Sequence, residues 1–292
     1  MTTLPAPPTS KRQLPTGHYK FRHALGSEWI KFRTVRSTMW CLGTFSLIMI
    51  GFSALFCAVT VSQWGKRPEE ALTFDPVTAS LAGVTMGSLA IGVLGVLVVS
   101  SEYGTGSIKA TFAAIPHRTT VLLAKAVVLS ISVFIVAAIS ELIAFFLGQT
   151  ILRSASGSQP IVINGVHLPA KPPTVTLSGP GVMTALVATA LFLTLLSLLT
   201  LGLGFLIRHT AGAISAFVGL LFPLFLLVVL LPATFKDRLE KFLPLQIQQT
   251  VVASKPIVSA TSLSIWAGVL AMAVYAVVAL AIGAVLLTRR DA

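Results

Sequence analysis

Six long apolar runs constrain the fold of this chain more than any other feature of its sequence. They lie at about 39–61, 81–100, 126–150, 182–207, 211–231 and 264–288. A bilayer core about 30 Å thick needs roughly 20 apolar residues in a crossing helix, so each run is long enough to span it. Of the 292 residues, 55% are hydrophobic and 10% are charged, and the mean hydropathy is +0.90. The sequence predicts an all-α, polytopic membrane protein with six transmembrane helices, which forms one membrane domain over residues 38–292.

Two different segments precede the first run. Residues 1–17 carry four prolines and no hydrophobic pattern, which predicts a disordered cytoplasmic tail. In residues 18–37, apolar side chains recur at helical spacing with cations on either side: Phe21, Leu25, Trp29 and Phe32, flanked by Lys20, Arg22, Lys31 and Arg33. This pattern predicts an amphipathic helix in the membrane interface, with its cations toward anionic lipid. The alternative is a basic flank that only orients the first span. No apolar core of the signal-peptide type precedes that span, so we expect no cleaved export signal.

The distribution of charge indicates topology. The net charge is +12. With the N-terminus in the cytoplasm, 13 of the 21 lysines and arginines fall on the cytoplasmic side, and most of the others lie in longer loops, which have less influence on orientation. We therefore expect a protein of the cell membrane with both termini in the cytoplasm, and no nucleic-acid partner.

The polar stretch 101–125, between the second and third runs, holds the densest set of helix signals outside the membrane. Residues 107–114 are predicted to form about two helical turns, and Pro116 ends them before Thr119 or Thr120 caps the next helix. A segment held between two membrane helices can transmit a movement from a soluble partner into the bilayer. The alternative is an ordinary polar loop.

Two further features concern the membrane helices themselves. Gly83 and Gly87, followed by Gly92 and Gly95, predict a face of close helix packing. Glu141 is the only acidic residue in any apolar run. A carboxylate there is costly unless it is paired, protonated or facing water, which makes Glu141 a candidate for the substrate pathway. The alternative is a protonated side chain that hydrogen-bonds to Ser140 or to a neighbouring helix.

The loops between the later runs carry weaker signals. Residues 161–166, in the loop 152–180, are predicted to pair briefly as a strand. In the loop 233–261, Phe235, Leu239 and Phe242 share one helical face, which predicts a short amphipathic helix at the outer surface.

Nothing in the sequence predicts chemistry by this chain. It contains no phosphate-binding loop, no zinc-protease motif, no His/Cys cluster with metal spacing and no nucleophile elbow. An intramembrane enzyme would need a pair of catalytic residues on facing helices, and the apolar runs contain one Glu without such a partner. Any ATP must be bound by another chain.

Several short motifs, in order, resemble those of type-2 ATP-binding cassette exporter permeases, especially from high-GC Gram-positive bacteria. They are L-G-S-E-W-I-K-F-R-T-V-R-S-T at 25–38, S-E-Y-G-T-G-S-I-K-A-T at 101–111, A-x-P-H-R at 114–118, L-L-A-K-A at 122–126, F-F-L-G-Q at 145–149, R-H-T-A-G-A-I-S-A at 208–216 and the closing T-R-R-D-A. The resemblance covers most of the chain from about residue 20.

The resemblance implies a permease subunit that pairs with a second copy or a close paralogue and docks a separate ATP-binding cassette ATPase, which holds ATP and magnesium. No cofactor is then expected in this chain. The segment after the second span would be a cytoplasmic coupling helix that contacts the ATPase. The positions that inherit this role are Glu102, Tyr103, Gly104, Thr105, Gly106, Ser107, Ile108 and Lys109, with Pro116 and Arg118 closing the segment.

The same resemblance does not identify the substrate, and it leaves open one alternative to an exporter. The N-terminal amphipathic helix looks like the family's connecting helix, and the loop 233–261 looks like the external helices above its pathway. Glu141 matches no motif of the family. Because the spans are nearly free of charge, we expect a hydrophobic or amphipathic substrate, such as a drug, a lipid-like molecule or a modified peptide. The alternative is a non-transporting immunity or signalling subunit of the same architecture.

Overall fold

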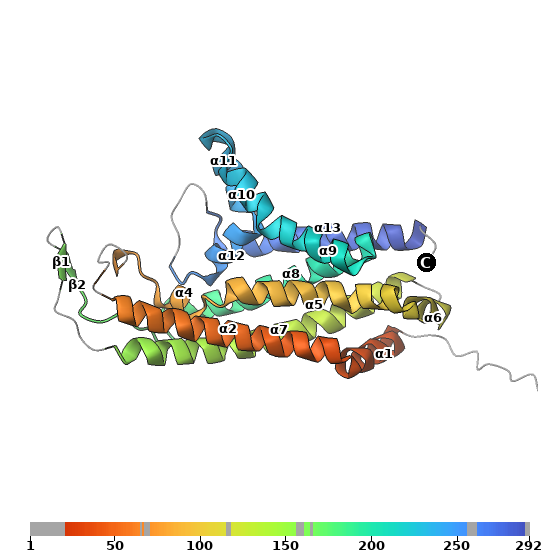
Figure 1. Ribbon diagram of the computed structural model, residues 1–292, viewed down its shortest axis with the longest axis horizontal. Coiled ribbons are helices and arrows are strands. Elements are labelled where there is room, and N and C mark those ends of the chain that lie inside the picture. Colours follow the sequence, from red (N-terminus) through yellow and green to blue (C-terminus); the bar gives the residue numbers. More distant parts are fainter. Residues whose placement is uncertain are drawn as a thin grey trace, which may run out of the picture.

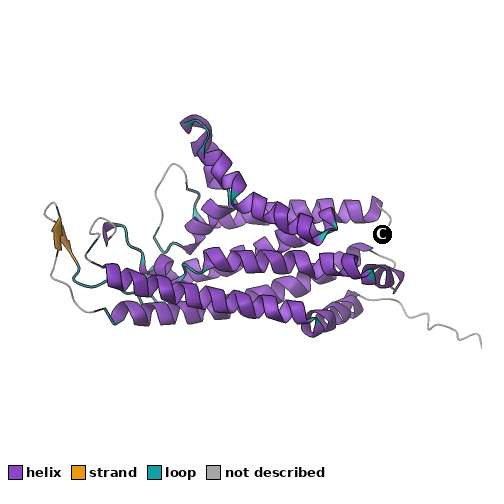
Figure 2. Ribbon diagram, in the orientation of Figure 1, coloured by secondary structure: helices purple, strands orange, loops and turns teal. Residues whose placement is uncertain are grey.

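The computed structural model describes residues 21–64, 66, 71–114, 118–155, 161–163, 166–255 and 262–289. The predicted tail at 1–17, Pro116 and the loop residues 256–261 lie outside these ranges. The described part is a bundle of long helices (Figure 1), with α1 and the C-terminal end of α13 at one end of it. Figure 2 shows the two strands at the opposite end.

The elements follow the apolar pattern of the sequence. They are α1 (Phe21–Thr34), α2 (Arg36–Gln63), α4 (Pro76–Ser80), α5 (Val84–Thr105), α6 (Ser107–Ala114), α7 (Arg118–Arg153), β1 (Ile161–Ile163), β2 (Val166–Leu168), α8 (Val182–Ile207), α9 (Thr210–Leu221), α10 (Pro223–Val229), α11 (Ala233–Leu239), the 3-10 helix η1 (Glu240–Phe242), α12 (Pro244–Val252) and α13 (Ile265–Arg289). Strands β1 and β2 form an antiparallel hairpin.

Six helical segments are long and apolar enough to cross a membrane, which confirms the prediction of six spans. They are α2, α5, α7, α8, α9 with α10, and α13. Helix α7 begins at Arg118 and has 36 residues, so it reaches about 54 Å at 1.5 Å per residue. It therefore extends well beyond a bilayer core, and its first turns lie beside α1 and α6 at the end of the bundle shown on the right of Figure 1.

Helix α8 forms the centre of the bundle and packs against α5, α7 and α13. About two thirds of its most apolar segment is buried, against less than a quarter for α2, for α9 with α10, and for α13. A central helix surrounded by helices with exposed apolar faces is the arrangement expected when lipid, not water, covers the outer surface.

The glycines of the second span pack closely, as predicted, but they serve three neighbours instead of one face. A Cβ on Gly83 or Gly87 would meet α2, one on Gly92 would overlap the ring of Phe217 in α9, and one on Gly95 would meet the backbone of α8. Because each lacks a side chain, α5 can approach all three helices.

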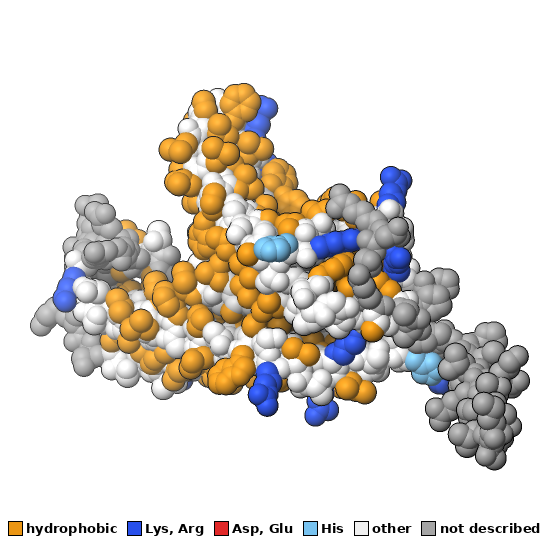
Figure 3. All heavy atoms as spheres, turned by 45° about the vertical axis from the view of Figure 1, so that its right-hand side comes forward, with side chains coloured by type: hydrophobic (Ala, Val, Ile, Leu, Met, Phe, Trp, Pro, Cys, Tyr) orange, Lys and Arg blue, Asp and Glu red, His pale blue; other side chains and the backbone are white. Residues whose placement is uncertain are grey.

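The fifth apolar run is broken, which the sequence analysis did not predict. Helix α9 ends at Leu221, and α10 starts at Pro223. Proline cannot donate the backbone hydrogen bond that would continue the helix and clashes with the preceding turn. Beyond this break, α10 and α11 project away from the bundle (Figure 1). The predicted amphipathic helix is present as α11 and η1, and Figure 3 shows hydrophobic side chains over this projecting segment.

Candidate functional site

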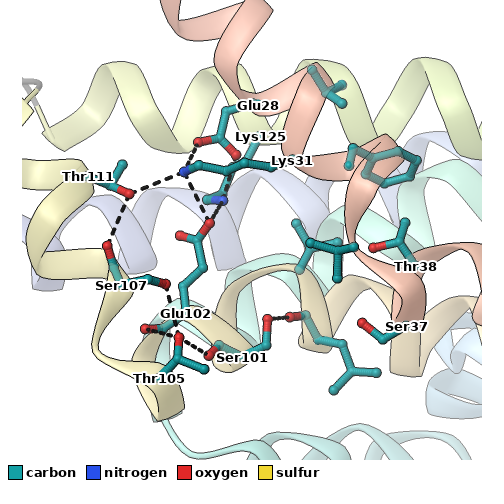
Figure 4. Close-up of a pocket in the computed structure, with 15 residues that line it drawn as sticks. Glu28, Lys31, Ser37, Thr38, Ser101, Glu102, Thr105, Ser107, Thr111 and Lys125 are labelled. Atoms are coloured by element: carbon teal, nitrogen blue, oxygen red, sulfur yellow. Dashed lines mark hydrogen bonds and ion pairs between the residues drawn. The ribbon is translucent and has the colours of Figure 1, made fainter.

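Four charged side chains meet where α1, α5 and α7 come together, and we call them the charge cluster: Glu28, Lys31, Glu102 and Lys125 (Figure 4). The ammonium Nζ of Lys125 lies 2.6 Å from Glu28 Oε2 and 2.8 Å from Glu102 Oε1. Lys31 Nζ lies 2.8 Å from Glu28 Oε1 and 3.2 Å from Glu102 Oε1. Two carboxylates and two ammonium groups therefore form a compact, electrically balanced set.

Three of the four side chains of the charge cluster are largely buried, unlike those of an ion pair on the surface. The exposed fraction of the side chain is 2% for Lys125, 4% for Glu28 and 13% for Glu102, whereas Lys31 is 36% exposed. Buried charges are stable only when each finds a partner, and removing one partner leaves an uncompensated charge. The buried members consequently fix how α1, α5 and α7 sit against one another.

Lys31 extends the charge cluster to a fourth helix. Its Nζ also donates to Thr111 Oγ1 of α6 at 3.2 Å. Burial disfavours the charged form of Lys31, but the hydrogen bond and charge of Glu28, and then those of Glu102, outweigh it and raise the pKa above its usual 10.5. A raised pKa means that the stabilisation is complete below 10.5 and is lost only as the pH rises through the higher folded value.

The segment predicted to contact an ATPase divides into a buried start and an exposed turn. Glu102 belongs to the charge cluster, while the next exposed residues run from the end of α5 through Gly106 to the first residue of α6, and together they are called the turn: Gly104, Thr105, Gly106 and Ser107. Gly106 has φ 71°, a left-handed conformation that ends α5 and that favours glycine. Ile108 points back into the protein and is 2% exposed. The predicted helix at 107–114 is confirmed as α6.

The remaining predicted positions lie around this turn. Tyr103 presents its ring to the guanidinium of Arg208, 5.3 Å away. Arg118 lies over the ring of Phe112 at 5.5 Å and donates to the carbonyl of Leu287 at 3.0 Å. The Lys109 side chain and Pro116 lie outside the described part of the chain. Arg118 thus links the start of α7 to the last turn of α13.

A cavity of about 360 Å³ adjoins the charge cluster (Figure 4). Its lining comes from α1, the start of α2, α5, α6 and α7: Glu28, Lys31, Phe32, Val35, Ser37, Thr38, Leu97, Val98, Ser101, Glu102, Thr105, Ser107, Thr111, Lys125 and Val128. Such a size is at the lower end of the range for small-molecule sites. In the described part of the chain, no group of three His, Cys, Asp or Glu side chains could hold a metal ion.

Glu141 lies apart from this cavity, inside the bundle. It is completely buried, and neither carboxylate oxygen has a hydrogen-bond partner among the described residues. Ser140 donates instead to Ser46 of α2 at 2.9 Å. The alternative, in which Glu141 hydrogen-bonds to Ser140 or to a neighbouring helix, therefore has no such bond in the described residues. A place for Glu141 in the substrate pathway stays a prediction.

The charge cluster was not predicted from the sequence, although the position of Glu28 is one signal of it. Glu28 follows Leu25 by three residues and precedes Phe32 by four, so it lies on the apolar side of α1. A carboxylate on that side indicates a buried cation. The apolar residues expected on one face of this helix are divided, because Phe32 is buried against the bundle whereas Trp29 is 43% exposed. The placement of α1 in the membrane interface stays a prediction. Lys31 is held in the charge cluster instead of pointing freely toward lipid.

Comparison with known proteins connects this geometry to a family. Residues 24–168, about half of the chain, match the model described as ABC-2 family transporter protein. The matched stretch begins in α1 and continues through α5, α6 and α7 to β2. It therefore contains all four residues of the charge cluster and the predicted coupling segment. No curated protein matches the chain.

Proposed function

We propose, from the premise that this chain belongs to the ABC-2 transporter family, that it is the permease subunit of an ATP-driven exporter. The family partners with an ATP-binding cassette subunit, so ATP and magnesium would be held by that separate chain. We propose that the ATPase contacts the turn between α5 and α6. Movement there would be passed to the helices that line the pathway.

This proposal rests on one observation: an exposed turn follows closely after a largely buried residue that is held by ion pairs. Gly104 to Ser107 are exposed at the end of the bundle, where a soluble partner can reach them. Two residues before Gly104, Glu102 is joined to Lys125 of α7 and, through that cation, to Glu28 of α1. A push on the turn would therefore move α1, α5 and α7 together instead of bending one loop.

Three parts of the proposal concern the assembly. A second copy or a close paralogue would complete the pathway in the cell membrane, with both termini in the cytoplasm. The substrate would be hydrophobic or amphipathic, because the six membrane-spanning segments are nearly free of charge. Glu141 would lie on the route of the substrate, since its buried carboxylate has no partner in the described residues of this conformation.

A matched pair of glycine substitutions tests the coupling role. A Cβ at Gly106 or at Gly51, which lies in α2 away from the turn, meets no atom within 4 Å, so neither change causes a clash. Of the two, only Gly106 has a positive φ, at 71°, where a β-branched residue is strained. We expect Gly106→Val to lower transport and the ATPase stimulation by this subunit, while Gly51→Val leaves both near the original level and both variants insert into the membrane.

The measurement is ATP-dependent flux in vesicles that contain the subunit and its co-purified ATPase. Equal activity of the two variants would show that the shape of the turn is unimportant and would remove the coupling role. Absence of flux with the unaltered chain, despite a bound ATPase, would favour the non-transporting subunit.

A further inference from the structure

The cavity beside the charge cluster has features that the transmission of movement between helices does not require. Glu102 lines the cavity, and its Oε2 atom is shielded from solvent without a hydrogen-bond partner among the described residues. A carboxylate oxygen without a hydrogen-bond donor is costly. A ligand in the cavity would supply that donor once the Glu102 carboxylate turned toward it.

Lys31 is the member of the charge cluster that can serve a ligand. It is 36% exposed, whereas Lys125 is 2% exposed and contacts both carboxylates by itself. The ammonium of Lys31 can therefore turn toward an anion in the cavity while Lys125 still compensates Glu28 and Glu102.

The start of α2 adds an anion-binding feature on the other side of the cavity. Ser37 and Thr38 lie there, across from Lys31 and Glu102 (Figure 4). The N-cap Val35 offers no side-chain cap to the helix. The N–H of Thr38 already donates to the carbonyl of Val35 at 3.2 Å, so the N–H groups of Arg36 and Ser37 are the ones at this helix start that attract negative charge. A phosphate between these two N–H groups and Lys31 would interact with both.

The balance of charge decides which kind of ligand fits. The charge cluster contains two cations and two anions, so a purely anionic or cationic ligand would leave a net charge in a half-enclosed cavity. A zwitterion keeps the balance, with its anionic group at Lys31 and its ammonium at Glu102. Much of the remaining wall is apolar and is formed by Phe32, Val35, Leu97, Val98 and Val128.

The position along the helices indicates where such a ligand comes from. The cavity lies where polar α1 joins apolar α2, and the exposed side chains of Trp29 and Trp40 flank this junction. Exposed tryptophans at the end of a membrane helix are typical of the headgroup region. We propose that the cavity binds the headgroup of a zwitterionic phospholipid from the adjacent leaflet. This inference does not depend on transport or on an ATPase.

Native mass spectrometry of the full-length chain in mild detergent tests the proposal. The probes are dioctanoyl phosphatidylethanolamine, dioctanoyl phosphatidylglycerol and free phosphoethanolamine. We expect the ethanolamine lipid to bind about tenfold more tightly than the glycerol lipid, because only the former offers a cation to Glu102. The free headgroup should bind more weakly than the lipid, because it cannot use the apolar wall.

Variants identify the cavity as the site. Lys31→Gln should weaken binding of the ethanolamine lipid by about tenfold, and Arg33→Gln, at an exposed cation two residues along α1 that does not line the cavity, should leave it unchanged. Ser37→Leu narrows the cavity without touching the four charges and should also weaken binding.

Three results would overturn the proposal. Equal or tighter binding of phosphatidylglycerol would indicate a simple anion site. An equal loss in Lys31→Gln and Arg33→Gln would indicate general attraction to a basic surface. Unchanged binding in both Lys31→Gln and Ser37→Leu would place the lipid elsewhere on the protein.

Discussion

Replacing Lys125 with methionine removes the most buried cation of the charge cluster while keeping a long apolar side chain. The substitution deletes the contacts of 2.6 Å to Glu28 and 2.8 Å to Glu102. Both carboxylates must then share Lys31, which is 36% exposed and lies 3.2 Å from Glu102. The cluster changes from a balanced set to one with an excess negative charge in a largely buried place.

The expected cost follows from that imbalance. Breaking a buried ion pair by removing one partner typically lowers the free energy of unfolding by about 3–5 kcal/mol, a large fraction of the total for most proteins. The double variant Glu28→Gln, Lys125→Met removes one charge of each sign. It should be more stable than Lys125→Met alone, because Lys31 and Glu102 then compensate each other.

The assay is the midpoint of thermal unfolding in one detergent at one heating rate, because unfolding of such proteins is seldom reversible. Lys236→Met is the control, since Lys236 is 36% exposed and lies 4.0 Å from Glu240. Pairs of that kind contribute at most about 1 kcal/mol. If Lys125→Met lowered the midpoint no more than Lys236→Met, or if the double variant were the least stable of all, the charge cluster would not hold these helices together.

Three further changes probe the packing, the buried acid and the far end of the bundle. Gly92→Ala should lower the free energy of unfolding by about 1–3 kcal/mol, because the new methyl overlaps Phe217; thermal unfolding measures the loss, and an unchanged midpoint would contradict the close packing of α5 and α9. Glu141→Gln should leave the midpoint of thermal unfolding about equal, because the carboxyl group has no hydrogen-bond partner in the described residues that the change could remove, yet lower transport in vesicles; full transport would exclude Glu141 from the pathway. Asp75→Ala should lower the free energy of unfolding by about 2–4 kcal/mol, because Asp75 caps α4 through the Val77 N–H and accepts hydrogen bonds from the N–H and the hydroxyl of Ser254; an unchanged midpoint of thermal unfolding would show that this connection is weak.

The sequence alone was sufficient for the all-α class, the six spans and the helix after the α5 turn. These features depend on local signals, namely the length of each apolar run, the glycine that ends α5 and the residues that favour α6. The fifth span was less well predicted, because hydropathy records how apolar a run is and not whether its two halves remain in line.

Only the tertiary structure decided which charges meet. Glu28 and Lys125 are 97 positions apart in the chain, and neither belongs to a recognisable motif with the other. Their contact arises because α1 packs on the long first part of α7, which brings an acid on the inner side of one helix to a cation on the other. Apolar periodicity fixes the lengths and faces of helices, whereas the pairing of buried charges depends on how those faces pack, and this can be read only from the folded chain.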